Sequence, residues 1–154
     1  MVAQRSLDEV FGIFEDPYNL AKITPSWLSF QVVSTNRVTM KQGAEIEYRI
    51  RWLGLPMHWK TVITEYRPPH LFVDEQAKGP YSYWRHQHTF KETSQGVVIG
   101  DHLRYALPLG ILGRIAHGVM VSQQLRSVFE YRQERLAKLF GGDAKTTVAP
   151  TIRD

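Results

Sequence analysis

Residues 79–90 read Gly79-Pro-Tyr-Ser-Tyr-Trp-Arg-His-Gln-His-Thr-Phe90, a turn followed by a strand. Alternate side chains of a strand lie on the same face of the sheet. One face of this strand therefore carries two imidazoles between two large aromatic rings: Trp84, His86, His88 and Phe90. Two imidazoles in that setting are unusual for a purely structural core, and they indicate a wall that contacts a ligand.

Turn residues divide the middle of the chain into further short segments, and strands are expected at residues 28–35, 45–52, 57–66, 71–76, 83–91 and 97–107. One helix begins after Ser6, where Glu9 completes a capping box, and a second short helix covers residues 18–23. Between residues 112 and 140 the apolar side chains recur at helical spacing. The pattern predicts an α+β domain over residues 1–140, in which a curved antiparallel sheet surrounds a long C-terminal helix, followed by a flexible tail over residues 141–154.

Composition narrows the class of protein. The 154 residues suit one domain, and the absence of Cys excludes disulfide bonds and thiolate metal sites. No apolar run reaches the roughly 18 residues that span a bilayer, and the N-terminus lacks the apolar core of a signal peptide. We therefore expect a cytoplasmic protein without membrane insertion. Its net charge of +4 favours anionic partners only slightly.

The first central hairpin is expected to turn at Gly54-Leu55. Its register then pairs four sets of residues: Trp52 with Met57, Ile50 with Trp59, Tyr48 with Thr61, and Ile46 with Ile63. Cross-strand partners share a face, so nearly all the apolar side chains lie on one side. The other side carries a solvated basic set, namely Arg49, Arg51, His58 and Lys60.

The last hairpin is expected to turn at Ser94-Gln95, which pairs Phe90 with Ile99, His88 with Asp101, His86 with Leu103, and Trp84 with Tyr105. His88 should then face Asp101 on the concave side. A carboxylate beside an imidazole in a low-dielectric site favours the charged pair or fixes the imidazole tautomer. The turns around residues 71–76 leave either face of that strand open, and we expect Phe72, Asp74 and Gln76 to point inward.

Local motifs along the chain resemble the START/Bet v 1-like (SRPBCC) superfamily, in its bacterial ligand-binding, polyketide cyclase/dehydrase-like branch. The matching motifs are Val10-Phe11 with Phe14, Asn19-Leu20, Ile23-Thr24-Pro25, Gly54 with Pro56 and Trp59, Val73-Asp-Glu-Gln76, Gly79-Pro-Tyr81, Trp84 with His86, His88 and Phe90, Asp101 with Tyr105, Leu107-Pro-Leu-Gly110, and Phe129 with Tyr131-Arg132. They cover residues 7–140. The resemblance implies a helix-grip fold, in which the sheet wraps the last helix and leaves an apolar cavity between them.

The chain departs from that superfamily at its start. Such folds open with a strand of about ten residues that joins the two ends of the sheet, whereas only residues 1–5 precede the first helix here. The strand is either shortened or begins before this chain does. This departure affects one wall of the expected cavity.

Several of these residues also have a purely structural explanation. The Trp side chains could be plain core, and His86, His88 and Asp101 could form a satisfied buried network. A zinc site built on His86, His88 and Asp101 would lack a third His ligand. We therefore expect no metal and no cofactor. Arg132, on the apolar stripe of the last helix, is expected to extend its head to solvent or to form an ion pair. The basic face lacks interleaved aromatics, so we expect no nucleic acid partner.

We therefore expect a protein that binds or carries an apolar or aromatic small molecule, lipid-like or polyketide-like, between sheet and helix. The expected ligand-binding side chains are Tyr48, Trp52, Trp59, Trp84, His86, His88, Asp101 and Tyr105. The alternative is a cyclase or dehydratase acting on a polyketide-like substrate, with His88 and Asp101 as the candidate general base. A third reading is a regulatory module that binds a partner through the basic face. No nucleophile elbow, phosphate loop or metal motif is present, which favours binding over catalysis.

Overall fold

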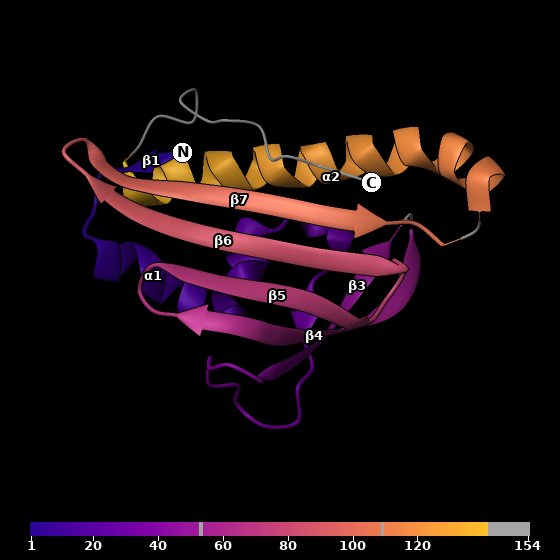
Figure 1. Cartoon of the computed structure of the whole chain (residues 1–154), viewed down its shortest axis with the longest axis horizontal. Helices are drawn as coiled ribbons and strands as arrows, with labels where there is room; N and C mark the ends of the chain where they lie inside the picture. The colour runs from indigo at the N-terminus through magenta and orange to yellow at the C-terminus, as the bar shows by residue number, and fades with distance from the viewer. Residues whose placement is uncertain (53, 109, 142–154) are drawn as a thin grey trace.

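The computed structural model describes the backbone of residues 1–52, 54–108 and 110–141, together with their side chains except those of Trp52 and residues 110–119. A seven-stranded antiparallel sheet forms its centre, in the order β1-β7-β6-β5-β4-β3-β2 (Figure 1). The five long strands are β3 (Glu45–Trp52), β4 (Leu55–Arg67), β5 (Leu71–Lys78), β6 (Tyr83–Thr93) and β7 (Gly96–Ala106). They follow one another in sequence and in space, as the turn pattern predicted.

Short elements at the N-terminus fill the inside of the curved sheet. Strand β1 (Val2–Ala3) pairs with β7, and helix α1 (Leu7–Glu15) follows it. The predicted capping box is present: the backbone N–H of Glu9 donates to Ser6 Oγ at 3.4 Å, and that of Ser6 donates to Glu9 Oε2 at 3.0 Å. The second short helix is the 3-10 helix η1 (Pro17–Ile23), where the Asp16 side chain accepts from the N–H of Tyr18.

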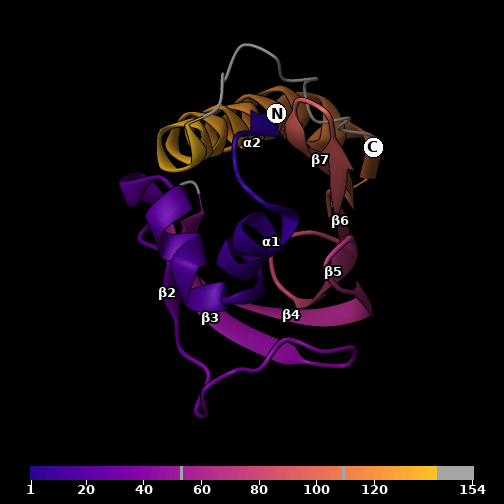
Figure 2. The same ribbon diagram turned by 90° about the vertical axis from the view of Figure 1, so that its left-hand side faces the viewer.

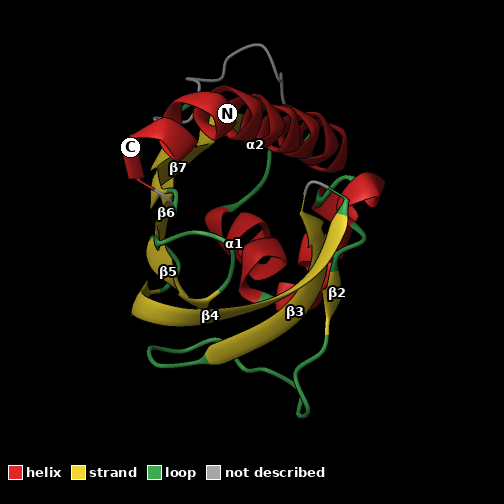
Figure 3. Cartoon of the chain, turned by 90° about the vertical axis from the view of Figure 1, so that its right-hand side faces the viewer, coloured by secondary structure: helices red, strands yellow, loops and turns green. Residues whose placement is uncertain are grey.

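The sheet curls from β7 through β4 to β3, and helix α2 (Gly110–Phe140) closes its open side while α1 lies inside the curl (Figures 2 and 3). The described face of α2 packs on the sheet through Val121, Leu125 and Phe129, which share a buried cluster with Trp59 and Leu103. A second cluster joins α1, the far end of α2 and the sheet. The helix-grip α+β fold is therefore confirmed. No helix in the described part of the chain has both the length and the apolar character needed to cross a bilayer.

The register of the last hairpin is the predicted one. His88 pairs with Asp101, Phe90 with Ile99, and Trp84 with Tyr105. This register places the two imidazoles on the concave side, where both are buried. The polar residues of the same strands, such as Arg104, lie on the outer side.

The register of the first central hairpin is two residues away from the predicted one. Tyr48 pairs with Trp59 rather than with Thr61, and Trp52 pairs with Leu55 rather than with Met57. Strand β3 ends at Trp52 and β4 begins at Leu55, so the chain reverses one residue earlier than expected, at Gly54, whose φ of 81° only glycine adopts readily. A shift by two residues preserves the faces, so the apolar set still points inward.

Residues 28–35 form less strand than expected. The 3-10 helix η2 (Ser26–Leu28) occupies the start of the segment, and Ser29 reverses the chain in the left-handed region with φ of 47°. Only β2 (Gln31–Val32) then pairs with β3. Beyond it the backbone N–H of Val33 donates to the Glu47 carbonyl at 2.8 Å, and the Ser34 hydroxyl accepts from the N–H of Glu47 at 2.9 Å, so a side chain ends the pairing at this edge.

The outer face of β3 and β4 is less basic than the sequence suggested. The Nζ atom of Lys60 lies 2.6 Å from Glu45 Oε2, and the Nε2 atom of His58 lies 3.2 Å from Glu47 Oε2. Glutamates from β3 thus neutralise much of the expected basic face. This arrangement weakens the reading in which the face binds an anionic partner.

Candidate ligand-binding pocket

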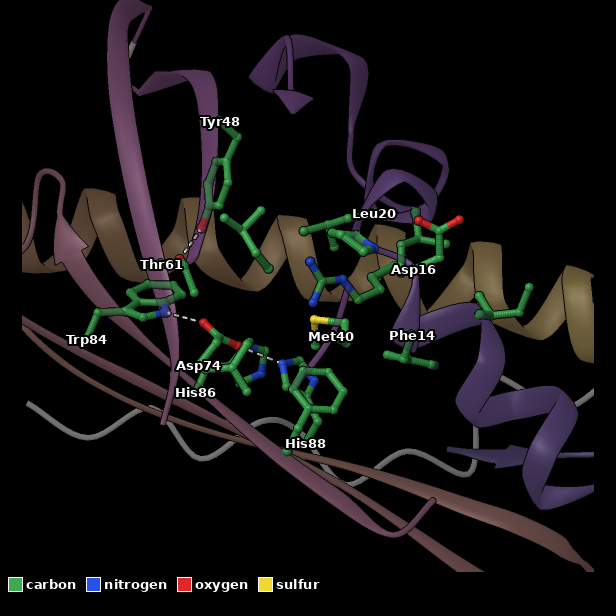
Figure 4. A pocket seen from close by; sticks show the side chains of 17 residues that line it. Phe14, Asp16, Leu20, Met40, Tyr48, Thr61, Asp74, Trp84, His86 and His88 are labelled. Carbon is green, nitrogen blue, oxygen red and sulfur yellow. Dashed lines mark hydrogen bonds and ion pairs between the residues drawn. The ribbon is translucent and has the colours of Figure 1, made fainter. Parts of the chain in front are cut away.

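A pocket of about 120 Å³ lies between the concave side of the sheet, the N-terminal elements and α2 (Figure 4). The sheet supplies Ile46, Ile63 and Phe72, and the opposite wall includes Phe14 and Leu20. Most of the lining is apolar, because alternate residues of each strand point inward and the amphipathic α1 presents its apolar side. The polar groups gather at a few points of this lining.

Two carboxylates and two imidazoles form the main polar group, here called the His–Asp cluster: Asp74 on β5, His86 and His88 on β6, and Asp101 on β7. In the strand ladder Asp74 is directly opposite His86, and Asp101 is directly opposite His88. The inward orientation of Phe72 and Asp74, which the turns left open, is confirmed by their place in the pocket lining.

The hydrogen bonds of the cluster run diagonally across the ladder. His86 Nε2 and Asp101 Oδ1 are 2.9 Å apart, as are His88 Nε2 and Asp74 Oδ2. The directly opposite pairs are close but poorly aligned: His88 Nδ1 lies 3.0 Å from Asp101 Oδ1, and His86 Nδ1 lies 3.6 Å from Asp74 Oδ2. His88 Nδ1 therefore has an ionic contact but no aligned acceptor among the described residues.

Burial and charge set the protonation of the cluster. Burial alone would lower the pKa of His88, but its contacts with Asp101 and Asp74 outweigh burial and raise that pKa. Burial and the neighbouring charge of His88 lower the pKa of His86. Burial alone would raise the pKa of each carboxyl, yet the imidazoles hold the pKa of Asp74 below its usual value and that of Asp101 well below it. These directions favour ionised carboxylates, and they favour a charge on His88 over one on His86.

Aromatic rings hold the cluster in place. The His88 ring stacks on Phe72, with centroids 4.2 Å apart, and the His86 ring meets the edge of Phe129 on α2 at 5.4 Å. The indole N–H of Trp84 donates to Asp74 Oδ1 at 3.3 Å. The cluster therefore links β5, β6, β7 and α2 through packing as well as hydrogen bonds.

A second polar group joins three side chains on β3 and β4. The hydroxyls of Tyr48 and Thr61 are 2.8 Å apart, and the indole N–H of Trp59 donates to Thr61 Oγ1 at 3.1 Å. Burial, reinforced by the charge of Asp74, raises the pKa of Tyr48, so its hydroxyl stays protonated. Tyr48 and Thr61 line the pocket, whereas Trp59 lies behind them in the core.

The structure brings four of the eight expected ligand-binding side chains to the pocket, namely Tyr48, Trp84, His86 and His88. Trp59 and Tyr105 are buried in the cluster under α2, and Asp101 acts behind His86 and His88. The side chain of Trp52 lies outside the described residues. Contact of any of these residues with a ligand stays a prediction.

At about 120 Å³ the pocket is smaller than the few hundred Å³ that is usual for a small-molecule site. Met40, which precedes β3, and the residues of α1 and η1 occupy part of the concave side. The small residues Gly113, Ala116 and Gly118 in the sequence of α2 favour a larger cavity beside them, but their side-chain positions lie outside the described residues. The pocket does touch both Trp84 and α2, as expected.

Asp74 and Arg132 line the pocket but were not among the expected ligand-binding side chains. Asp74 was expected to point inward but was given no role, although an acid on an inward-facing side of a strand is a signal of one. Arg132 was expected to reach solvent or to form an ion pair: the residue is half-buried and forms no ion pair in the described part of the chain, but it also lines the pocket, where its Nε atom is buried without an acceptor among the described residues. Its position on the apolar stripe of α2 was the available signal.

The donor atoms of Asp74, His86 and His88 lie within 4.8 Å of one another, so these residue types could hold a metal ion. In the arrangement observed, every imidazole nitrogen already lies between 2.9 and 3.6 Å from a carboxylate oxygen. Carboxylate oxygens thus already surround these nitrogens, although His88 Nδ1 has no aligned acceptor among the described residues. A structural or ligand-orienting role fits this geometry better than metal binding.

Comparison with solved structures finds the same fold in proteins of distant sequence. Protein Ms6760 from Mycobacterium smegmatis is 16% identical with a TM-score of 0.64, covering 92% of this chain and 87% of that one. TTHA0849 from Thermus thermophilus is 14% identical with a TM-score of 0.65, covering 90% and 94%. NE0264 from Nitrosomonas europaea is 15% identical with a TM-score of 0.61, covering 90% and 91%. At such identities the likeness concerns the fold alone.

A search of curated proteins finds none that matches the chain. The family model described as polyketide cyclase / dehydrase and lipid transport matches residues 4–148. That match spans strands β2 to β7, helices α1 and α2, and every residue that lines the pocket. The chain therefore belongs to the polyketide cyclase/dehydrase and lipid transport family.

Proposed function

We propose that this protein binds and carries a small apolar or aromatic molecule in the pocket between the sheet and α2. The observation that carries the proposal is the mostly apolar lining with its polar groups confined to a few points. Apolar walls supply affinity without direction, and a few polar groups fix the orientation of the bound molecule. The family's description, which includes lipid transport, is consistent with this role.

The internal pairing of the His–Asp cluster favours binding over catalysis. A general base needs a nitrogen that is free to reach the proton it abstracts. The nitrogens of His86 and His88 instead face Asp74 and Asp101. A proton taken from a ligand would have to displace one of these contacts.

One observation favours the alternative, a cyclase or dehydratase. His88 Nδ1 has no aligned acceptor among the described residues, and His88 lines the pocket, so a modest rotation would bring a charged imidazole to a bound carbonyl. If this reading is correct, His88→Ala abolishes turnover of a polyketide-like test substrate while the substrate still binds. If the protein is a carrier, no turnover is found in the wild type.

Native mass spectrometry of the protein as purified from cells tests the proposal first. We expect a bound species that organic solvent releases. The neutral aromatic 1-naphthol provides a defined probe for the protein after extraction, with binding followed by fluorescence or calorimetry. Absence of both a co-purifying molecule and 1-naphthol binding would contradict the proposal.

A pocket-filling variant gives the matched comparison. Leu20 lines the pocket from η1, so Leu20→Trp should occupy its space and weaken 1-naphthol binding at least about tenfold. Leu139 is half exposed near the end of α2 and does not line the pocket, so Leu139→Trp adds the same indole without effect. Thermal melts confirm that both variants fold. Equal binding by the two would place the probe elsewhere.

A further inference from the structure

The pocket contains a charged side chain that the proposed function does not explain, Arg132 of α2. Its Nε atom is buried and has no hydrogen-bond acceptor among the described residues. Buried polar atoms of native proteins are nearly always paired, and an exception indicates a missing partner or a function. A guanidinium stays charged at all physiological pH values, so it cannot relieve its burial by losing a proton.

Arg132 also lacks an ion pair. Asp16 and Asp74 line the same pocket, yet no ion pair joins Arg132 to a carboxylate in the described part of the chain. The contact it does make is with the Phe129 ring, whose centroid lies 5.5 Å from its Cζ atom. A ring face holds a guanidinium in position but accepts none of its N–H groups in the guanidinium plane.

The charge of Arg132 acts inside the pocket. It opposes the rise that burial causes in the pKa of Tyr48, whose hydroxyl lies on the β3 side of the same space. A guanidinium presents its N–H groups in a planar fork that matches the two oxygens of a carboxylate. The remaining lining is mostly apolar, which suits a ligand with one charged end and an uncharged body.

Size narrows the ligand further. A cavity needs a volume of roughly 10–15 Å³ to hold one water molecule. The pocket of about 120 Å³ therefore has room for on the order of ten non-hydrogen atoms. That is the size of an aromatic acid or of a short aliphatic acid.

We propose that the pocket takes a small monocarboxylic acid, whose carboxylate pairs with Arg132 and whose apolar body packs between the sheet and α1. This inference rests on the proposed function, since it names the class of molecule bound at the same site. Asp16 and Asp74 repel the acid from their own sides and leave Arg132 as its anchor.

A purely structural role for Arg132 makes a different prediction. The His–Asp cluster has two carboxylates, and the charge of Arg132 could offset them through space. In that case Arg132 stabilises the folded protein but gives no preference for acids. The comparison of an acid with its neutral isostere separates the two roles.

Benzoate and benzamide have nearly the same shape and differ in charge, so their affinities are compared by calorimetry at pH 7. For the wild type we expect benzoate to bind at least about tenfold more tightly, the scale of a hydrogen bond to a charged group. Arg132→Gln should weaken benzoate by a factor of about 10 to 100 and benzamide by no more than about threefold. Arg132→Lys should retain part of the preference, because it keeps the charge but not the fork.

Arg126 provides the matched control. It lies on the same helix and is exposed, so Arg126→Gln removes the same charge without changing either affinity. A direct readout on the wild type covers the case in which Arg132→Gln does not fold. The Nε–H resonance of Arg132 in a nitrogen-15 NMR spectrum, assigned through its loss in Arg132→Lys, should shift on addition of benzoate and not of benzamide.

Three outcomes overturn the inference. Equal affinities of the wild type for benzoate and benzamide mean that the pocket binds small molecules without an anionic subsite, and the proposed function then survives. A benzoate preference that persists in Arg132→Gln, or an unmoved Nε–H resonance, places the anion elsewhere. If neither compound nor 1-naphthol binds and nothing co-purifies, both the subsite and the proposed function fail.

Discussion

His88 Nε2 lies 2.9 Å from Asp74 Oδ2, one step diagonally across the β5–β6 pair rather than opposite to it. The second aligned bond of the cluster, between His86 and Asp101, is also diagonal. Each imidazole therefore links its own strand to both neighbouring strands, and the cluster ties three strands together across the middle of the sheet.

Removal of the His88 ring should destabilise the protein. His88→Ala leaves Asp74 without its closest partner and removes a ring that stacks on Phe72. We expect a loss of about 1–3 kcal/mol in the free energy of unfolding, measured by urea titration. His102→Ala on the outer face of β7 is the control and should cost less. If His88→Ala leaves the free energy of unfolding unchanged but weakens ligand binding, then water solvates the remaining cluster and His88 serves the ligand.

The contribution of His88 should decrease as the pH rises. Its pKa in the folded protein is raised above the ordinary value of 6.5, because Asp101 and Asp74 outweigh burial. A group with a raised folded pKa stabilises fully below its unfolded pKa, and this contribution is lost as the pH passes through the folded pKa. The stability advantage of the wild type over His88→Gln should therefore be largest below about pH 6 and shrink above about pH 7.

An advantage over His88→Gln that grows with pH would show that His88 is neutral in the folded protein. The pH dependence that His86 gives to stability has the opposite sign. Its pKa in the folded protein is lowered, so the neutral imidazole stabilises the fold above about pH 6.5, and this stabilisation is lost on acidification. Resolved imidazole resonances in an NMR titration separate the two residues.

Thr61 should matter more to stability than Tyr48. Thr61→Val keeps the side-chain shape but leaves both the Tyr48 hydroxyl and the Trp59 indole N–H without a partner. We expect it to cost about 1–3 kcal/mol, and Tyr48→Phe to cost less, because Thr61 then still accepts from Trp59. Chemical denaturation of both single variants and the double variant measures the coupling. Equal losses of stability in Thr61→Val and Tyr48→Phe would indicate that water replaces Thr61 as the partner of the Tyr48 hydroxyl and the Trp59 indole N–H.

Gly96→Ala should detach β1 from the edge of the sheet. Gly96 has a φ of 117°, and an added Cβ would collide with the carbonyl oxygen of Ala3. The strain is on the order of 1–3 kcal/mol. The N–H of Ile99, which donates to the Met1 carbonyl at 2.8 Å, should then lose protection from hydrogen exchange, whereas the N–H groups of β5 keep theirs. Unchanged protection at Ile99 would mean that the edge adapts without release.

Local patterns along the chain were enough to predict most of the elements and their faces. Alternation placed His86 and His88 on the concave side, and the short connection after Thr93 set the register that puts His88 opposite Asp101. These features depend on the residues of one turn and on the alternation of side chains between the two faces of a strand. Both can be recognised in the sequence of a single strand pair. The first hairpin shows the limit, because the two registers around Gly54 share the same faces and the apolar pattern does not distinguish them.

The diagonal bonds, the size of the pocket and the place of Arg132 depend instead on the assembled fold. Asp74 reaches His88 diagonally across the strand pair, a contact that depends on the twist of the sheet and on the packed side-chain conformations. The pocket volume depends on how far α1 and Met40 fill the concave side. Arg132 is half-buried, and α2 packs so that it lines the mostly apolar pocket without an ion pair to any described carboxylate. Such packing depends on side chains distant in sequence, so the pattern along one helix could not reveal it.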